Sequence, residues 1–419
     1  MTSPPAPAAS PFPIRFTGDA RAYWRLLTRG ALLLMVTLGI YRFWLTTDVR
    51  RFLWSSTEVN GESIEYSGTA AELLIGFLIA LALLVPVYAA FFLAALDVGA
   101  FGQMSGSLGI ALLFVLGQYA VFRARRYRAS RTIYRGLRFH QEGSAVRYAI
   151  CATIWWSLTA LTLGLAFPWK ESRLERFKMR HTFYGTLPGR FDGYGFSLFL
   201  RGLPLWLLVA LPLAAGLTAL GQSFDPDLLD RAFAESSNDF LERIARDNPD
   251  FAGAIVFALL SAGVTLVLGL LLYPAFQAIR TRWWVSGLRI GAITARSHLR
   301  TLPMYGLYLR FAGLALLFLL ALGLAAIPLV MIYGALLGNG DVSILRELAA
   351  SLIGLGFYVV AMLGLSTLYR GAVVMPQWRL TVESTELSGL AGLDHVEAAG
   401  EPGSPVGEGL ADALHVGGI

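Results

Sequence analysis

The chain has 419 residues, of which 56% are hydrophobic and 15% charged, with a formal net charge of +6 at pH 7. Soluble domains carry about 25% charged residues, so this composition excludes an ordinary soluble enzyme. The single cysteine, Cys151, excludes an internal disulfide. The five histidines lie at no metal-ligand spacing, and we therefore expect neither a metal site nor a cofactor.

The chain opens with "MTSPPAPAASPFPIRF", which lacks the basic stretch and apolar run of a signal peptide. Beyond it, six segments have the roughly 20 apolar residues that a spanning helix needs. Two further segments, 23–44 and 149–169, are marginal. The six comfortable segments are about 70–96, 104–122, 196–220, 251–276, 304–336 and 345–369.

The basic residues predict how these segments are oriented, because basic loops stay in the cytoplasm. Loop 123–147 has eight arginines, loop 170–190 has six basic residues and loop 280–300 has five arginines. Loop 221–250 has eight acids against three arginines. The first three loops are therefore expected inside and the fourth outside, with both termini cytoplasmic. The pattern "DPDLLDRAFAESSNDFLERIARDNPD" predicts an acidic extracytoplasmic helix at 225–248.

The marginal segments conflict with this orientation if they span the membrane. A spanning 149–169 would place its two basic flanking loops on opposite faces. We therefore expect 149–169 and the similar 23–44 to enter and leave on the cytoplasmic side, turning at Leu163–Gly164 and Leu38–Gly39. The alternative is eight spans.

A repeated pattern links the ends of these segments. Arg51, Thr57 and Gly68 recur at the same offsets in two further places. The pair Asn60-Gly61 predicts a two-residue hairpin turn, because both central positions of that turn need a positive φ. A strand-like run at 378–384 follows the last span. The two further copies are Arg126, Thr132 and Gly143, and Arg176, Thr182 and Gly193.

These patterns together predict an all-α polytopic membrane protein. It has six spanning helices plus two re-entrant or interfacial segments (or eight spans), an internal duplication and small cytoplasmic β-hairpins. The predicted organisation is a disordered cytoplasmic N-terminus at 1–20, membrane repeat 1 at 21–145, membrane repeat 2 at 146–300, a third helical hairpin at 301–380 and an acidic disordered tail at 381–419.

The stretch "YWRLLTRGALLLMVTLGIYRFWLTTDVRRFLWSSTEVNGESIEYSGTAAELLIGFL" resembles the opening of the YjgN-like family, classed as domain of unknown function 898. The resemblance implies a multi-pass protein of the bacterial inner membrane and transfers no catalytic residue. The chain departs from the family in its few lysines and its long Gly/Pro-rich ends. It also has no phosphate-binding loop, His-Glu-x-x-His or Gly-x-Ser-x-Gly, so we expect no enzyme activity.

The candidate site residues fall into two groups. Arginines at the ends of apolar segments are expected to contact lipid phosphate or the membrane interface. A second group, on the marginal segments, is expected at an anion site or pore. The first group is Arg50, Arg51, Arg125, Arg126 and Arg176, and the second is Arg25, Arg29, Thr37 and Thr162.

Two functions fit these residues. A small-solute transporter or channel-like protein is slightly favoured, by analogy with duplicated architectures with broken helices. The alternative is a non-enzymatic scaffold or envelope-maintenance protein that binds anionic lipid or a partner protein. The expected partners are the lipid bilayer and its anionic headgroups, with a small solute or a membrane-protein partner, and no nucleic acid.

A reporter fused after Arg180 distinguishes six spans from eight. We expect a cytoplasmic signal there, because the basic loop 170–190 stays inside. An enzymatic reporter that is active on only one side of the membrane gives the measurement. An extracytoplasmic signal would contradict the re-entrant arrangement and favour eight spans.

Overall fold

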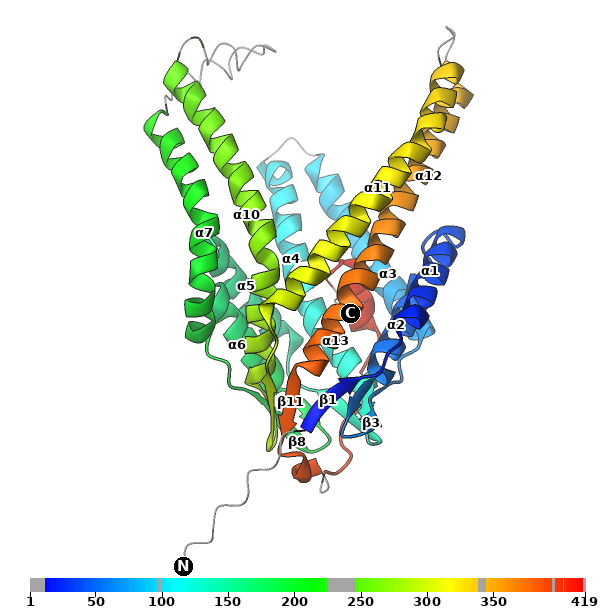
Figure 1. The fold of residues 1–419 in the computed structure, drawn as a ribbon, viewed down its shortest axis with the longest axis vertical. Coiled ribbons are helices and arrows are strands. Elements are labelled where there is room, and N and C mark those ends of the chain that lie inside the picture. The colour runs from blue at the N-terminus through cyan, green and yellow to red at the C-terminus, as the bar shows by residue number, and fades with distance from the viewer. Residues whose placement is uncertain are drawn as a thin grey trace, which may run out of the picture. The chain divides into compact units, whose positions relative to one another are not determined.

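The computed structural model describes residues 12–96, 100–224, 246, 248–337, 344–393, 396–401 and 403–416. The chain divides into two compact units (Figure 1). Unit 1 comprises Met1–Gly195 with Thr281–Ile419, and unit 2 is Phe196–Arg280. Almost all of the predicted acidic helix at 225–248 lies outside the described residues.

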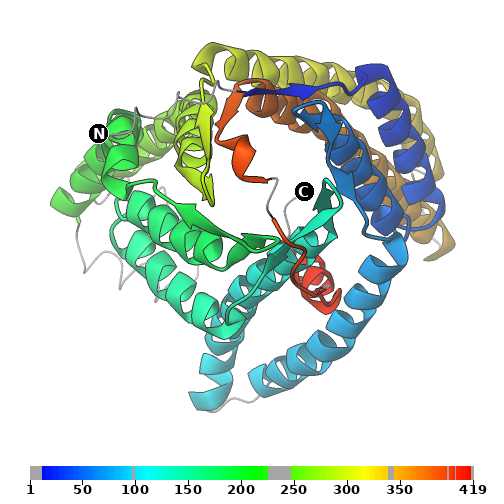
Figure 2. The ribbon, with the colours of Figure 1, turned by 90° about the horizontal axis from the view of Figure 1, so that it is seen from below.

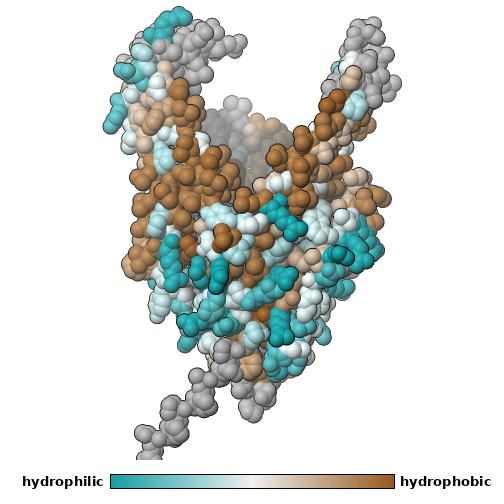
Figure 3. All heavy atoms as spheres, viewed as in Figure 1, coloured by the Kyte–Doolittle hydropathy of each residue, from teal (hydrophilic) through white to brown (hydrophobic). Residues whose placement is uncertain are grey.

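Six described helices are long and apolar enough to cross a membrane, as the sequence predicts. In unit 1, few of the residues in the spanning parts of these helices are buried, so most of their apolar surface faces outward. Figure 3 shows this apolar surface along α11 and α12, with polar side chains gathered nearer the strands. The six are α3 (Ala70–Ala95), α4 (Ala100–Arg131), α7 (Gly195–Gln222), α10 (Pro249–Gly287), α11 (Thr301–Leu337) and α12 (Ile344–Tyr369).

Both marginal segments form short helical hairpins instead of single spans. In the first, Leu38 and Gly39 have φ values of 49° and 91°, and in the second Leu163 and Gly164 have the same two values. The amide of Gly39 donates to the Leu34 carbonyl at 2.8 Å, which closes the helix end before the chain reverses. The predicted turns are confirmed. The helices are α1 (Ala20–Val36) and α2 (Arg42–Ser55), and α5 (Ala145–Leu161) and α6 (Phe167–Arg180).

The strands join into one antiparallel sheet of eleven strands, in the order β3-β2-β1-β11-β10-β9-β8-β7-β6-β5-β4. Its two end strands, β3 and β4, are separated in the chain only by Ile64, so the backbone itself closes the sheet into a ring. The strands are β1 (Phe12–Phe16), β2 (Thr57–Val59), β3 (Glu62–Ser63), β4 (Glu65–Tyr66), β5 (Thr132–Tyr134), β6 (Leu137–Gln141), β7 (Thr182–Tyr184), β8 (Leu187–Phe191), β9 (Leu288–Ile290), β10 (Ile293–Ser297) and β11 (Thr385–Ser388).

Helical hairpins and strand pairs alternate along the chain. From α1 to β6 the chain forms a short helical hairpin, a strand pair, a long helical hairpin and a second strand pair. The same order recurs from α5 to β10. A last long hairpin then leads through η1 (Arg370–Val374) and α13 (Met375–Glu383) to β11, which pairs with β1. The domain boundaries predicted from the sequence stay a prediction.

Tight turns connect the strands of each pair. Asn60 and Gly61 have φ values of 51° and 83°, and Arg135 and Gly136 have 48° and 73°. Both pairs therefore have the two positive φ values of a type I′ turn, and the turn predicted at Asn60-Gly61 is confirmed.

The predicted fold class is confirmed in part. The fold is mostly helical with short β-hairpins, but the hairpins join one sheet, because hairpins this short are marginal alone. Two further predictions, about the run 378–384 and the ends of the chain, are wrong. The run 378–384 is helical to Glu383, and the strand follows it. The expected disorder fails at residues 12–16, which form β1 between β2 and β11, and over much of the tail. The ordered tail comprises β11, the 3₁₀ helix η2 (Leu390–Leu393) and α14 (Val406–Ala413).

Apolar side chains fill the inside of the ring. Val59, Tyr134 and Tyr184 occupy the third position of successive first strands and pack with Leu390 and Leu393 of η2. The Tyr184 hydroxyl donates to the Tyr134 carbonyl at 2.9 Å, and the Tyr134 hydroxyl donates to the Val59 carbonyl at 3.0 Å. Figure 2, seen from below, shows η2 within the outline of the ring of strands, and Figure 1 shows it at the end of the ring that lies away from the spanning helices of unit 1. The tail thus supplies part of the core of the ring.

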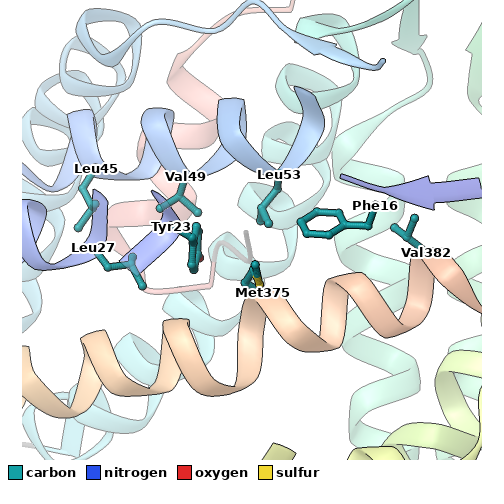
Figure 4. Close-up of a cluster of buried hydrophobic side chains, with 8 residues drawn as sticks. All are labelled: Phe16, Tyr23, Leu27, Leu45, Val49, Leu53, Met375 and Val382. Atoms are coloured by element: carbon teal, nitrogen blue, oxygen red, sulfur yellow. The ribbon is translucent and has the colours of Figure 1, made fainter. Parts of the chain in front are cut away.

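A second core fixes the first short hairpin to helix α13. Tyr23 and Leu27 of α1 and Leu53 of α2 are at most 1% exposed, and they pack with Met375 of α13 (Figure 4). Phe16, at the end of β1, joins the same cluster beside Val382. This cluster connects strand β1, the first short hairpin and helix α13.

A glycine two positions after an aromatic residue follows each of three strands, β1, β4 and β8. A Cβ added at Gly193 would lie 2.5 Å from the Phe191 ring, and one at Gly68 would lie 2.6 Å from the Tyr66 ring. Gly18 meets Phe16 in the same way, at 2.6 Å. Each ring therefore folds back over its glycine, and no other residue leaves room for it.

Gly193→Ala is expected to destabilise unit 1 by about 1–3 kcal/mol, because the added methyl overpacks the buried Phe191 ring. The thermal unfolding midpoint in detergent measures this. Gly202→Ala in α7 is the matched control, since no atom lies within 4 Å of its new Cβ. Equal midpoints for the two variants would contradict the packing described here.

Candidate functional site

The C-terminal helix α14 packs between α3 and α4 at a crossing of glycines. A Cβ added at Gly409 would lie 1.9 Å from the Gly76 carbonyl carbon, and one at Gly76 would lie 2.4 Å from the Pro405 carbonyl oxygen. Gly407 approaches Arg123 in a similar way, at 2.3 Å from its Cβ. Only residues without side chains permit backbones to approach this closely. The sequence of α14, "VGEGLADA", therefore fits this groove.

The same packing of α14 places Glu408 beside two arginines, Arg50 and Arg128. Glu408 Oε1 accepts a hydrogen bond from Arg50 Nη2, and its Oε2 lies 3.8 Å from Arg128 Nε. Arg50 also donates through Nη1 to the Tyr66 hydroxyl at 3.2 Å. Arg50 is 2% exposed and Glu408 5%. The site thus joins α2, α4, β4 and the tail, which lie far apart in sequence.

Burial sets the electrostatics of this site. Burial disfavours the Arg50 cation, but the Glu408 carboxylate and Tyr66 outweigh it and keep the pKa of Arg50 above its usual value. At the rim, Arg42 Nη2 lies 2.7 Å from Asp412 Oδ2. Burial, with Glu408 nearby, nevertheless raises the pKa of Asp412. The buried pair is thus the electrostatic centre of the site, and the rim pair is secondary.

Apolar contacts extend the site along α3 and α4. Leu410 and Ala411 of α14 pack with Ala80 and Leu84 of α3 and with Ala120 of α4. The groove beneath α14 is therefore basic at one end and apolar along its length. Among the residues that the structure describes, no group of three His, Cys, Asp or Glu side chains could hold a metal ion.

Three of the predicted lipid-contacting arginines form intramolecular ties. Arg51, Arg126 and Arg176 each donate to the carbonyl of the glycine 17 residues later. The Arg51 bond to Gly68 is 2.9 Å long, and the Arg176 bond to Gly193 is 3.2 Å long. The intervening threonine of each repeat donates to the carbonyl four residues before it. The repeated pattern thus ties each helix end to the end of its strand pair.

The other predicted residues are dispersed. Arg125 lies 3.9 Å from Glu175 Oε2 and 3.2 Å from the Met179 sulfur, so it contacts α6. Arg25 and Arg29 are exposed on α1. The predicted role of Arg25 and Arg29 at an anion site or pore stays a prediction.

The two threonines of that group act within the short hairpins. The Thr37 hydroxyl donates to the Leu33 carbonyl at 2.7 Å and accepts from the Tyr41 amide at 3.0 Å. The Thr162 hydroxyl makes the equivalent bonds to Leu158 and Ala166 in the second hairpin. Both hydroxyls therefore stabilise turns.

Sequence reasoning found Arg50 but missed its partners. Glu408 lies 358 residues away, in a Gly/Pro-rich segment with the composition of a disordered tail. The one signal was the alternation of glycine, acid and apolar residues in "GEGLADAL", which places small and apolar side chains on one helical face.

Comparison with known proteins agrees with the resemblance seen in the sequence. Residues 11–413 match the family described as "Bacterial protein of unknown function (DUF898)". "Inner membrane protein YjgN" of Escherichia coli O157:H7 is 28% identical over 159 residues, and that of Escherichia coli (strain K12) is 27% identical over 159 residues. The matched segment spans 36% of this chain and 36% of each relative's own length. No solved structure matches the chain.

Glu408→Gln is expected to release the tail. Removing one partner of a buried ion pair costs about 3 kcal/mol, which raises the undocked population of the tail about 100-fold. We therefore expect cleavage of residues 396–416 by an added protease to be at least tenfold faster. Glu401→Gln, an exposed position on the same segment, is the matched control. Mass spectrometry of the fragments gives the rates.

Asp412→Asn provides the contrasting result. Because the pKa of Asp412 is raised in the docked state, its ionised carboxylate weakens docking of α14. Docking therefore becomes more stable as the pH falls through that pKa. Asp412→Asn is therefore expected to leave the tail docked at neutral pH. Faster cleavage in Asp412→Asn than in Glu408→Gln would contradict the central role of the buried pair.

Proposed function

Since the chain belongs to the DUF898 family of bacterial proteins, we propose that it is a non-enzymatic, multi-pass inner-membrane protein that gathers anionic lipid around its ring of strands. The six apolar helices support the multi-pass arrangement. The names of the Escherichia coli relatives support the inner membrane as its location. In this arrangement the basic loops and the ring lie on the cytoplasmic side, as the charge pattern favours.

The observation that carries this proposal is the surface of the two short hairpins. Leu38, at the tip of the first, is 93% exposed, and Leu163, at the tip of the second, is 79% exposed. Val36 and Leu161 beside them are 79% and 80% exposed. Apolar residues exposed together at two equivalent tips mark a surface that contacts membrane. The tips are thus proposed to enter the inner leaflet.

Arginines on the first hairpin suit the phosphate layer. Arg29 precedes Val36 by seven residues, which is about 10 Å along a helix. With the tip among the acyl chains, Arg25 and Arg29 therefore reach the depth of the headgroups, where a guanidinium binds phosphate through two hydrogen bonds.

The filled ring is the reason for preferring a scaffold to a transporter. The Val59, Tyr134, Tyr184, Leu390 and Leu393 cluster packs the inside of the ring. A solute following the axis of the ring would meet this apolar core. The turn-closing role of Thr37 and Thr162 removes the hydroxyls that a pore would use.

Lipid retention tests the proposal. The full chain is exchanged into an equimolar mixture of phosphatidylglycerol and phosphatidylethanolamine in detergent, and the lipid retained after size exclusion is analysed. We expect at least twofold enrichment of the anionic lipid, reduced in Arg25→Gln/Arg29→Gln. Arg138→Gln, an exposed arginine on β6, is the control.

Two outcomes would contradict the proposal. One is a retained lipid composition equal to that of the mixture. The other is solute flux through the purified chain in vesicles, at rates well above those of protein-free vesicles, for any member of a panel of ions and small metabolites.

A further inference from the structure

The groove beneath α14 has the shape and chemistry of a lipid site. One end holds the buried guanidinium of Arg50 and the nearby guanidinium of Arg128, close to one carboxylate. Along its length, Ala80, Leu84 and Ala120 present an apolar surface to Leu410 and Ala411. α14 therefore imitates an anionic amphiphile, with a carboxylate head at the arginines and an apolar body between two spanning helices.

The groove continues beyond α14. Leu113 contacts the apolar cluster at α14, and it also lines an open apolar pocket farther along α3 and α4. Phe91 and Gly109 lie in the same pocket. From Gly76 to Phe91 the helix rises about 22 Å, which exceeds the thickness of one leaflet, about 15 Å of hydrocarbon. An acyl chain with its phosphate at Arg50 thus finds an apolar path along its whole length.

The charges near Arg50 suit the phosphate of a phospholipid. Arg50 and Arg128 contact the Glu408 carboxylate, and Arg42 contacts Asp412 at the rim. A phosphodiester, like a carboxylate, carries one negative charge on two terminal oxygens and binds guanidinium groups through parallel hydrogen bonds, so it can take the place of Glu408. Arg128 and Arg50 come from different helices, so both can approach the same headgroup.

The helix in the groove is suited to leave it. α14 has eight residues, well below the length at which a helix is stable alone in water. Gly407 and Gly409 lower its helix propensity further. The segment before it contains Gly400, Gly403 and Pro405. α14 therefore holds its helical form through docking, and a competitor for the groove releases it as a flexible chain.

We propose that the α3–α4 groove with Arg50 and Arg128 is a binding site for an anionic phospholipid, which α14 occupies in its absence. Lipid entry then displaces Glu408 and frees the tail on the cytoplasmic side. This inference rests on the proposed function, because it needs a protein that gathers anionic lipid. It adds a specific site and couples that site to the release of the C-terminal segment.

A dye on the tail reports its release. Cys151→Ala removes the native cysteine, and His415→Cys, at an exposed position beside α14, carries the dye in the full chain. We expect phosphatidylglycerol in mixed micelles to lower the fluorescence anisotropy of this dye in a saturable way. Phosphatidylcholine is expected to leave the anisotropy unchanged. Release by inorganic phosphate at the same concentrations as the lipid would overturn the assignment to phospholipid.

Two variants separate competition from general loosening. Glu408→Gln and Gly409→Ala both weaken docking of α14, the first by removing a charge and the second by placing a methyl against Gly76. Native mass spectrometry is expected to show at least fivefold tighter phosphatidylglycerol binding in both. Gly306→Ala in α11, where the new Cβ meets no atom within 4 Å, is the control and is expected to bind as wild type.

The outcomes distinguish this inference from the proposed function. If anionic lipid is enriched but neither Glu408→Gln nor Gly409→Ala tightens its binding, the inference fails and the proposed function stands. If no anionic lipid is retained by any variant, both fail. In the Glu408→Gln background, adding Arg50→Gln/Arg128→Gln is expected to abolish the gain in affinity, and retention of the gain would place the lipid elsewhere.

Discussion

Backbone hydrogen bonding around the ring of strands is the constraint on which the other features depend. A strand at the edge of a sheet leaves amides and carbonyls unpaired, and strands of two to five residues cannot form stable hairpins alone. Pairing each hairpin with the next meets both requirements except at the two end strands, β3 and β4. Ile64 connects these two strands covalently, since the chain passes through it from β3, paired with β2, to β4, paired with β5. Strand β1 joins β2 to β11 and so connects the two ends of the chain.

The repeated Arg-Thr-Gly pattern follows from this ring. Each strand pair must return the chain to a helix that starts beside the one that brought it. The 17-residue tie from Arg51 to Gly68, repeated at Arg126 and Arg176, fixes that return. An aromatic ring folded over the glycine, as with Phe191 and Gly193, packs the same corner. The arginines that mark the basic loops in the sequence therefore have a structural role.

The sequence predicted the parts of the structure that depend on local patterns. Six apolar runs became helices, Leu38–Gly39 and Leu163–Gly164 became turns, and Asn60-Gly61 formed its hairpin. It did not predict the ring, because strands such as Thr57–Val59 have no periodic signal and are held by partners distant in the chain. The tail was missed for the same reason. Its glycines disfavour a helix. The helix forms because Gly409 packs against Gly76 and Glu408 pairs with Arg50.

Filling of the ring and docking of the tail connect the fold to the proposed function. Leu390 and Leu393 complete the core of the ring, and the same segment continues to α14 in the groove of α3 and α4. The proposed release of α14 by lipid would therefore act on a segment that also packs against the core of the ring. The short hairpins, with apolar tips and exposed arginines, would keep anionic lipid near this groove.

Closure of the ring is the central claim, and a cysteine crosslink measures it most directly. In a Cys151→Ala background, Pro13→Cys and Glu386→Cys lie opposite each other on β1 and β11. They are expected to form a disulfide rapidly and almost completely under mild oxidation of the membrane-embedded chain. Pro13→Cys with Arg296→Cys, one strand farther along the sheet, is expected to crosslink little. Absence of the first crosslink, or equal yields for the two pairs, would contradict a closed ring.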